Sequence, residues 1–307
     1  MSPRFAISIP QLVTAGGFDP APFRAHLARA EALGFESAWT ADQVLGSMPM
    51  LDPLGAMTYA AAVTERIRLG CAVFVSTLHS PVHLAKNLST LDQLSGGRLE
   101  VGFGTGGGGR MFSAFGVDPA RVGSRFAEGL ELIKALWTEP KVDFDGQFWQ
   151  LAGAAMEPKP VQQPHPPIWI GANRPAALRR AAQLADGFFG AGSSTTAAFA
   201  AQVPIVREAL AEAGRDPAGF RIAKRVYIYV DDDAARAHQR TVELLDRIYG
   251  SSRRTDVESP SIDGPPDACA AALREVAAAG AELILLHPVA DDSEQMERLA
   301  AEVLPTV

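Results

Sequence analysis

The sequence predicts an α/β fold in which eight parallel strands each precede a helix, as in a (β/α)8 barrel of the TIM type. Short runs rich in Val, Ile and Phe alternate with longer stretches whose apolar residues recur at helical spacing. The chain has 307 residues, which is enough for one such barrel. A doubly wound open sheet is the alternative. It is disfavoured because no G-x-G-x-x-G motif follows the first strand.

The clearest βαβ unit runs from Leu69 to Gly107. Apolar runs at 69–75 and 99–103 flank a helical pattern whose members lie three residues apart, namely Ala85, Leu88, Leu91 and Leu94. Since a crossover helix covers one face, the two strands should be parallel and buried on both sides. Gly96 and Gly97 suit the left-handed backbone that often ends a helix. Glycines then follow the second strand, where backbone can closely approach a phosphate or a flat ring.

The rest of the first half keeps the same rhythm until a hairpin interrupts it. Strands are expected at 5–9 and 35–40, and helices at 23–33, 54–64 and 122–137. Two short alternating runs around Asp145 and Gly146 indicate a β-hairpin near 142–150. The proline-rich segment that follows it, 156–167, should be extended.

The second half returns to alternating strands and helices. Strands are expected at 167–171, 187–189, 220–230 and 282–286, and helices at 174–184, 195–213, 234–249, 267–279 and 293–303. Residues 250–266 are polar and irregular, so they predict a long loop, for which a lid is one role. We therefore expect one domain over residues 1–307, with the hairpin and the long loop as insertions.

Composition narrows the class of protein. A net charge of −7 and a pI near 5.4 argue against nucleic acid or an anionic membrane as partners. The first residues lack the apolar core of a signal peptide, and no apolar run is long enough to span a membrane. Cys71 and Cys269 are the two cysteines, with no CxxC motif, so we expect a cytoplasmic protein without a disulfide framework. Cys71 falls in a predicted strand and should be a core residue.

In a (β/α)8 barrel, functional residues lie at the carboxyl ends of the strands. The polar residues and glycines that follow the predicted strands are Gln11, Asp42, Gln43, Ser76, Thr77, His79, Thr105 to Gly109, Gly171 to Arg174, and His287. These are the candidate site residues.

Several of these candidates also have a purely structural interpretation. Gly171–Arg174 either cradles a phosphate with backbone N–H groups at a helix start or forms an ordinary tight turn. Asp42 either acts in the site or caps a helix or bonds to its own loop. His79 is either a proton donor or a loop histidine. His79 and His83 lack the third ligand that a metal site requires, so no metal is expected.

Several blocks of the sequence resemble the bacterial luciferase-like monooxygenase superfamily, in particular its coenzyme F420-dependent oxidoreductase branch. The blocks are FESAWTADQ, RIRLG, SPVHLAKNLSTLDQLSGGRLEVGFGTG, RFAEGLELIKALWTEPKVDFDGQFW, PKPVQQPHPPIWIGAN and LADGFF, which together extend over nearly the whole chain. The resemblance implies a luciferase-like barrel with an insertion, a flavin or deazaflavin at the carboxyl ends of the strands, and a homodimer.

The resemblance also implies cofactor contacts. The family has a non-proline cis peptide in its third strand, matching Ala72–Val73 here, where it would bulge toward the ring. The family's phosphate contacts match Gly106 and Gly171–Asn173, and its ring-side acidic residue matches Asp42. The cofactor-binding residues expected are Asp42, Ala72, Val73, Ser76, Thr105, Gly106, Gly107, Gly171, Ala172, Asn173 and Arg174.

At two positions the sequence differs from one subgroup of the family, and the differences limit which activities are expected. The F420-dependent sugar-phosphate dehydrogenases carry histidine directly after the aspartate and glutamate directly after G-x-G, whereas this sequence has Gln43 and Gly107. Neither residue can act as an acid or base near neutral pH, so that activity is disfavoured. Asp42, Gln43 and His79 are the candidates for catalytic residues.

The sequence thus predicts an oxidoreductase that transfers a hydride between F420 and a small organic substrate such as an enone, imine or ketone. An FMN-dependent two-component monooxygenase that uses O2 is the alternative, and a non-catalytic flavin- or deazaflavin-binding protein is a further one. The loops at 44–51, 108–121 and 250–266 would form the pocket wall. Because such loops vary, they do not identify the substrate.

Overall fold

The computed structural model describes residues 2–13, 16–106, 111–249 and 261–307. The chain forms two compact units. Unit 1 comprises Met1–Pro10, Asp19–Trp39 and Gly171–Val307, and unit 2 comprises Gln11–Phe18 and Thr40–Ile170.

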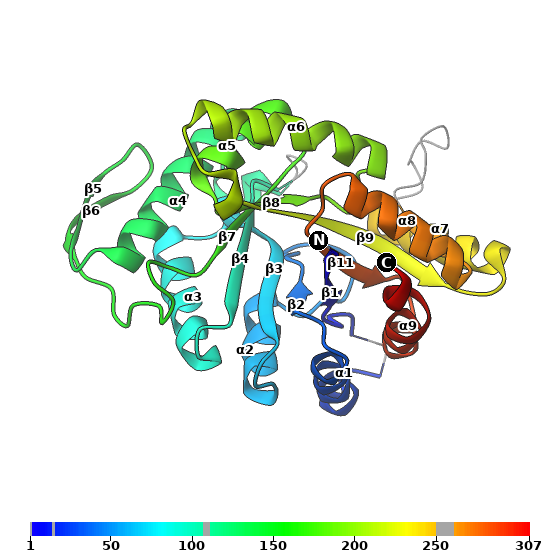
Figure 1. Ribbon diagram of the computed structural model, residues 1–307. Helices are drawn as coiled ribbons and strands as arrows, with labels where there is room; N and C mark the ends of the chain where they lie inside the picture. The colour runs from blue at the N-terminus through cyan, green and yellow to red at the C-terminus, as the bar shows by residue number, and fades with distance from the viewer. Residues whose placement is uncertain (1, 14–15, 107–110, 250–260) are drawn as a thin grey trace. The chain divides into compact units, whose positions relative to one another are not determined.

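Unit 2 contains the βαβ unit that the sequence predicts most clearly. Strand β3 (Arg68–Val75) pairs in parallel with β4 (Leu99–Gly104), and β4 pairs in parallel with β7 (Ile168–Ala172). Three helices, α2 (Pro53–Val63), α3 (Pro81–Ser95) and α4 (Val122–Thr138), pack in that order (Figure 1). All six residues of β4 are buried, as expected for a strand covered on both faces.

The ends of α3 follow from the residues at its termini. The side chain of Ser80 accepts a hydrogen bond from the His83 N–H, and Pro81 occupies the first turn, where a missing N–H costs nothing. The chain leaves the helix through Gly96 and Gly97, whose φ angles of 65° and 83° are left-handed. The prediction for this stretch is therefore confirmed.

The hairpin predicted near 142–150 is also confirmed. Strands β5 (Val142–Asp145) and β6 (Gln150–Ala154) pair antiparallel, and Figure 1 shows them extending beyond α4. The turn between the strands is held from α4, because Glu128 accepts hydrogen bonds from the backbone N–H groups of Gln147, Phe148 and Trp149. After the hairpin, the proline-rich connection has cis peptides at Glu157–Pro158 and Gln163–Pro164.

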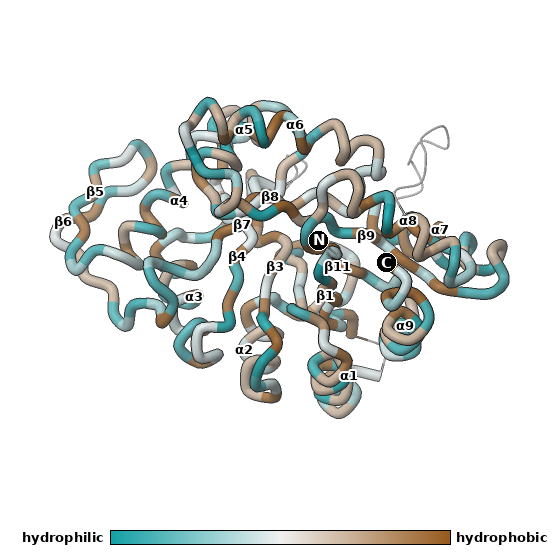
Figure 2. Tube along the Cα trace, in the orientation of Figure 1, coloured by the Kyte–Doolittle hydropathy of each residue, from teal (hydrophilic) through white to brown (hydrophobic). Residues whose placement is uncertain are grey.

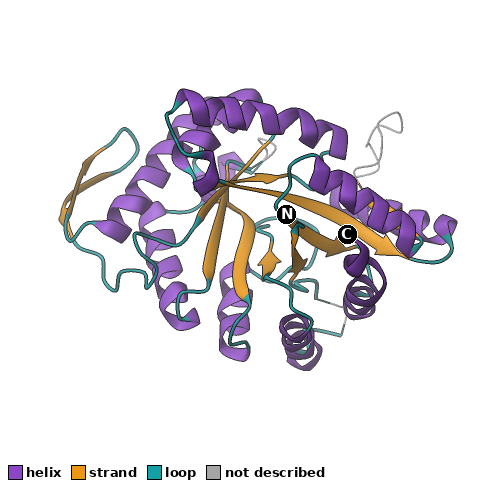
Figure 3. Cartoon of the chain, viewed as in Figure 1, coloured by secondary structure: helices purple, strands orange, loops and turns teal. Residues whose placement is uncertain are grey.

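Unit 1 contains a parallel sheet in the order β8-β9-β11-β1-β2. Its strands are β1 (Arg4–Ser8), β2 (Ser37–Thr40), β8 (Gly187–Gly190), β9 (Arg221–Val230) and β11 (Leu283–Pro288). Its helices are α1 (Pro20–Ala32), α5 (Pro175–Leu184), α6 (Thr196–Glu212), α7 (Ala234–Tyr249), α8 (Pro266–Ala278) and α9 (Asp292–Arg298). Figure 3 shows these strands and helices by colour, and Figure 2 shows apolar residues concentrated along strands such as β8.

One sequence expectation for unit 1 is wrong in part. Residues 261–264 were expected within a long loop, but they form strand β10 (Ser261–Gly264), which pairs in parallel with the end of β9. The pattern Ser-Ile-Asp-Gly has one strongly apolar residue, Ile262, which is buried, so the sequence offers too short a run to indicate a strand. Residues 250–260 of the expected loop lie outside the described part of the chain.

The predicted fold class is confirmed. In chain order, β1, β2, β3, β4, β7, β8, β9 and β11 are parallel strands that alternate with helices, as in a (β/α)8 fold of the TIM type with insertions. The hairpin β5–β6 and strand β10 are the additions to this pattern. That residues 1–307 act as one domain stays a prediction.

Candidate functional site

Asp42 lies on the loop that follows β2, and its carboxylate is turned toward the end of β3. Its Oδ2 accepts a hydrogen bond from the Val75 N–H at 2.9 Å and lies 2.9 Å from Nε2 of His79. The side chain is fully buried, whereas that of His79 is 21% exposed. The helix-capping interpretation of Asp42 is wrong, because Asp52 caps α2. The structure therefore brings together two of the three predicted catalytic residues.

The hydrogen bonding of this pair is asymmetric. An ionised carboxylate can only accept, so His79 carries a hydrogen on Nε2, and its Nδ1 is left to take or give a proton. The ring of His79 packs edge-on against Phe74 with centroids 6.4 Å apart. The second oxygen of Asp42, Oδ1, is buried and has no hydrogen-bond partner within the described part of the chain. A buried acceptor without a donor is costly, and a ligand N–H or O–H would remove that cost.

Strand β3 is irregular next to this pair. The peptide between Ala72 and Val73 is cis, as the resemblance implied, and the pairing with β4 shifts between Cys71 and Phe74. Cys71 and Phe74 are fully buried, as expected for Cys71, whereas Ala72 and Val73 are half-buried. Gly102 permits the close approach of β4, since a Cβ there would lie 2.2 Å from the carbonyl oxygen of Cys71. The irregular residues are thus the accessible ones.

The loops after β3 and β4 are tied together. The hydroxyl of Thr77 donates to the carbonyl oxygen of Thr105 at 3.0 Å, and the carbonyl of Ser76 accepts from the His79 N–H at 3.2 Å. Gly106 has a φ of 77°, and a Cβ there would lie 2.6 Å from Val75 Cγ1, so only glycine fits. Gly107, also predicted to bind the cofactor, is outside the described residues.

Two glutamines near Asp42 have different surroundings. Gln11 is buried and uses its amide to hold the loop after β2, donating to the carbonyls of Ala41 and Leu51 and accepting from the Ala41 N–H. It is therefore a structural residue. Gln43 is half-buried, and its side chain lies over Gly46, where a Cβ would be 1.4 Å from Gln43 Nε2.

The predicted phosphate cradle belongs to unit 1. Strand β7 ends at Ala172, the exposed Asn173 and Arg174 follow, and α5 begins at Pro175. The carbonyl of Arg174 accepts from the N–H groups of Ala177 and Leu178, so this is a tight strand-to-helix turn. The turn fits both interpretations of the sequence, and phosphate binding by Gly171–Arg174 stays a prediction.

His287 on β11, one of the candidates from the sequence, contacts polar side chains of β9 in unit 1 that sequence reasoning missed. Arg225 Nη2 lies 2.9 Å from Nδ1 of His287, and the hydroxyls of Tyr227 and Tyr249 are 2.9 Å apart. Burial, with a smaller effect of Arg225, lowers the pKa of His287 well below its usual value. Burial also lowers the pKa of Lys224 to about 7. The segment KRVYIYVD could have indicated this cluster, because Lys, Arg and Tyr are unusual inside a strand buried on both faces.

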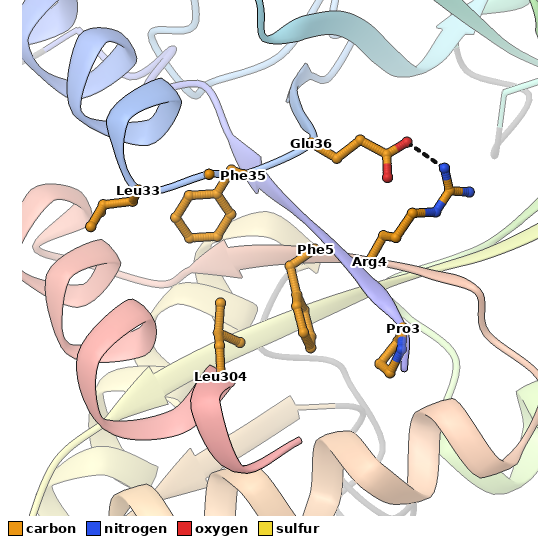
Figure 4. Close-up of a pocket in the computed structure, with 8 residues that line it drawn as sticks. Pro3, Arg4, Phe5, Leu33, Phe35, Glu36 and Leu304 are labelled. Atoms are coloured by element: carbon orange, nitrogen blue, oxygen red, sulfur yellow. Dashed lines mark hydrogen bonds and ion pairs between the residues drawn. The ribbon is translucent and has the colours of Figure 1, made fainter. Parts of the chain in front are cut away.

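A pocket of about 460 Å³ in unit 1 lies at the amino ends of strands β1 and β2. Its walls come from residues just before or within the starts of β1 and β2 and from the C-terminal segment, namely Pro3, Arg4, Phe5, Leu33, Phe35, Glu36 and Leu304 (Figure 4). Arg4 and Glu36 form an ion pair of 2.8 Å across one side. In such barrels the amino ends of the strands contribute to stability and the carboxyl ends carry the active site. This pocket is therefore not a candidate active site.

Within the described residues, no group of three His, Cys, Asp or Glu side chains could hold a metal ion. No helix there is both long and apolar enough to cross a membrane.

Comparison with known proteins identifies the family of this chain and the class of reaction of its relatives. The luciferase-like monooxygenase family matches residues 4–300. An F420-dependent glucose-6-phosphate dehydrogenase from Kineococcus radiotolerans is 27% identical, over 95% of this chain and 94% of its own length. The crystal structure of the monooxygenase RslO1 from Streptomyces bottropensis has a TM-score of 0.84 and 26% identity, covering 98% of this chain and 99% of that one.

A second solved structure, the coenzyme F420-dependent tetrahydromethanopterin reductase from Methanopyrus kandleri, has a TM-score of 0.80 and 23% identity, covering 99% of both chains. At that identity, the likeness bears on the fold alone. The family match extends over nearly the whole chain, and the relatives are oxidoreductases. The chain therefore belongs to the luciferase-like monooxygenase family and is an oxidoreductase.

Proposed function

We propose that this enzyme transfers a hydride between coenzyme F420 and a small organic substrate, with Asp42, Gln43 and His79 as its catalytic residues. The observation that carries the proposal is the Asp42–His79 pair, held at 2.9 Å beside the irregular part of β3. Its geometry unites a residue that can move a proton with a buried carboxylate oxygen that has no donor within the described ranges.

The residues of unit 2 fit a deazaflavin. Ala72 and Val73 are accessible, and Gly106 follows β4 in a left-handed conformation where a Cβ would meet Val75. Asp42 Oδ1 needs a donor, which the ring N–H groups or a substrate hydroxyl would supply. Ser76 and Thr105 complete the predicted cofactor-binding residues in this unit. In unit 1, the predicted contacts are Gly171, Ala172, Asn173 and Arg174.

The cofactor, when bound, supplies the hydride chemistry, and the chain supplies orientation and protons. Asp42 accepts from His79 Nε2 and so fixes the imidazole ring, with Nδ1 as the atom that gives or takes the proton. Gln43 cannot move a proton, but its amide could stabilise developing negative charge. In the structure that amide lies over Gly46.

The exposed apolar side chains of the loop after β2 favour an apolar organic substrate. Val44 and Leu45 on this loop are 41% and 50% exposed, directly after the catalytic candidates Asp42 and Gln43. Exposed apolar side chains beside a catalytic pair are typical of a substrate-facing wall. An enone, imine or ketone would suit such a wall, and Gln43 in place of histidine continues to argue against a sugar phosphate.

The choice of F420 is tested by binding. We expect the purified apoprotein to bind F420 at least tenfold more tightly than FMN, a difference of about 1.4 kcal/mol, in fluorescence titrations at equal ionic strength. The relative from Kineococcus radiotolerans, F420-dependent by its name, supports this choice. Equal or tighter binding of FMN would overturn it.

The alternative is an FMN-dependent monooxygenase that uses O2. The likeness to the monooxygenase RslO1, at 26% identity over nearly the full chain, favours it. Tighter FMN binding followed by oxygen consumption with reduced FMN and substrate would establish this alternative. We further propose that the enzyme acts as a cytoplasmic homodimer of single-domain subunits, which light scattering would test for the oligomeric state.

A further inference from the structure

Two arginines converge on the aromatic turn of the hairpin in unit 2. The guanidinium carbon of Arg121 lies 4.4 Å from the centroid of the Phe148 ring, and that of Arg125 lies 5.7 Å from it. Arg125 also lies 4.6 Å from the ring of Trp149. The two cations are one helical turn apart at the start of α4, so they form a single positively charged surface, which we call the arginine platform.

The charge of this platform is not neutralised by a bonded carboxylate. Within the described ranges, neither guanidinium lies within ion-pair distance of an acidic side chain. Glu128, whose charge acts on Arg125, directs both carboxylate oxygens to the backbone N–H groups of the hairpin turn. Partial burial lowers the pKa of Arg125, against a smaller opposing effect of Glu128, so packing removes water from this cation without supplying a bonded anion.

The platform is connected to the candidate active site through Arg125. Its Nε donates to the carbonyl oxygen of Thr77 at 3.3 Å, in the turn Ser76–Leu78 between β3 and His79. Thr77 in turn donates to Thr105, next to Gly106. One end of the platform therefore touches the loops expected to hold the cofactor, and the other end, Arg121, is exposed to solvent.

We propose that Arg121 and Arg125 bind the carboxylates of the glutamate tail of F420. This inference rests on the proposed function. A single small anion would need one guanidinium, whereas two stacked guanidiniums that lead outward from the cofactor loops suit a chain of repeated carboxylates. In a protein of net charge −7, such a local positive surface also attracts an acidic ligand that the rest of the molecule repels.

The test compares three ligands by fluorescence titration at low and high salt: F420 with several glutamates, the same cofactor without glutamates, and the deazaflavin core without phosphate. Arg121→Met and Arg125→Met should each weaken binding of the glutamate-bearing form by about threefold to tenfold, and leave the other two unchanged. The loss should shrink as salt rises. Lys141→Met, which removes an exposed cation of the same unit, should leave all three affinities unchanged.

Charge-preserving variants separate binding from folding. Arg121→Lys and Arg125→Lys keep the cations but lose the planar stacking, and they should retain most of the preference for the tail. Equal weakening of all three ligands by the Met variants, or none, would overturn the inference while leaving the proposed function in place. If none of the three ligands binds to the wild-type protein, the proposed function fails as well.

Discussion

At the scale of single residues, the chemistry of Asp42 depends on its burial. One carboxylate oxygen accepts from both the Val75 N–H and His79, and the other has no partner in the described part of the chain. Removing the carboxylate would leave a backbone N–H and an imidazole without an acceptor, so Asp42→Ala should disturb the end of β3 as well as turnover. Asp42→Asn keeps the shape and one oxygen, and is the better variant for separating the two effects.

His79 gives the sharpest prediction at this scale. We expect His79→Gln to lower the rate with saturating cofactor by about 100-fold, because the imidazole would no longer deliver the proton that accompanies hydride transfer. Loss of Asp42, the orienting partner of His79, should also lower the rate.

His83→Gln is the matched control for this experiment, since His83 belongs to the first turns of α3 and does not contact Asp42. It should keep the wild-type rate. A wild-type rate in His79→Gln would mean that protons come from water and that the loop histidine is structural.

At the scale of elements, periodicity and turn residues predicted most of the structure. Strands β3 and β4 with α3 between them, and the hairpin at Asp145 and Gly146, form where the sequence indicates. Contacts that hold the elements together were not predictable. The hydrogen bond from the Phe148 N–H to Glu128 joins residues that are 20 positions apart in the sequence. Strand β10 forms because β9 offers it a pairing edge, which its own four residues do not indicate.

Helix α1 carries a second prediction, on acid stability. His26 is 2% exposed, and its Nε2 donates to the carbonyl of Ser8 in β1 at 3.2 Å. Burial lowers its pKa to about 4 from an ordinary value of 6.5. The unfolded chain then binds the proton more readily, so the free energy of unfolding should decrease as the pH falls from about 6.5 to about 4, by up to about 3 kcal/mol.

Urea unfolding at a series of pH values would measure this effect. His26→Leu should flatten the dependence over that range, whereas His83→Gln, which changes an exposed histidine with no carboxylate partner in the described part of the chain, should not. If His26→Leu unfolds with the same pH dependence as the wild type, another group is responsible.

At the scale of the whole molecule, the alternation of strands and helices predicted the fold class, and the carboxyl ends of the strands indicated the region of the candidate site. Asp42 and His79 each follow a strand, and the structure pairs them. The cluster of Arg225, Tyr227 and His287 was not predicted as a group. Its members meet because β9 pairs with β11, and Arg225 and His287 are 62 positions apart in the sequence. Register between distant strands leaves little trace in a single sequence.

A buried network around Glu100 gives the last prediction. The Glu100 carboxylate is fully buried; one oxygen accepts from Arg68 Nε at 2.5 Å and the other from Trp169 Nε1 at 2.7 Å, so it joins β3, β4 and β7. Glu100→Gln would place an amide N–H against one of these donors, and should destabilise the protein by about 2–4 kcal/mol. The midpoint of urea unfolding would measure this cost, with the exposed Glu139→Gln as control. Since the network lies away from Asp42 and His79, the folded variant should keep the wild-type kcat, and a lower kcat would show that the sheet transmits the change to the site.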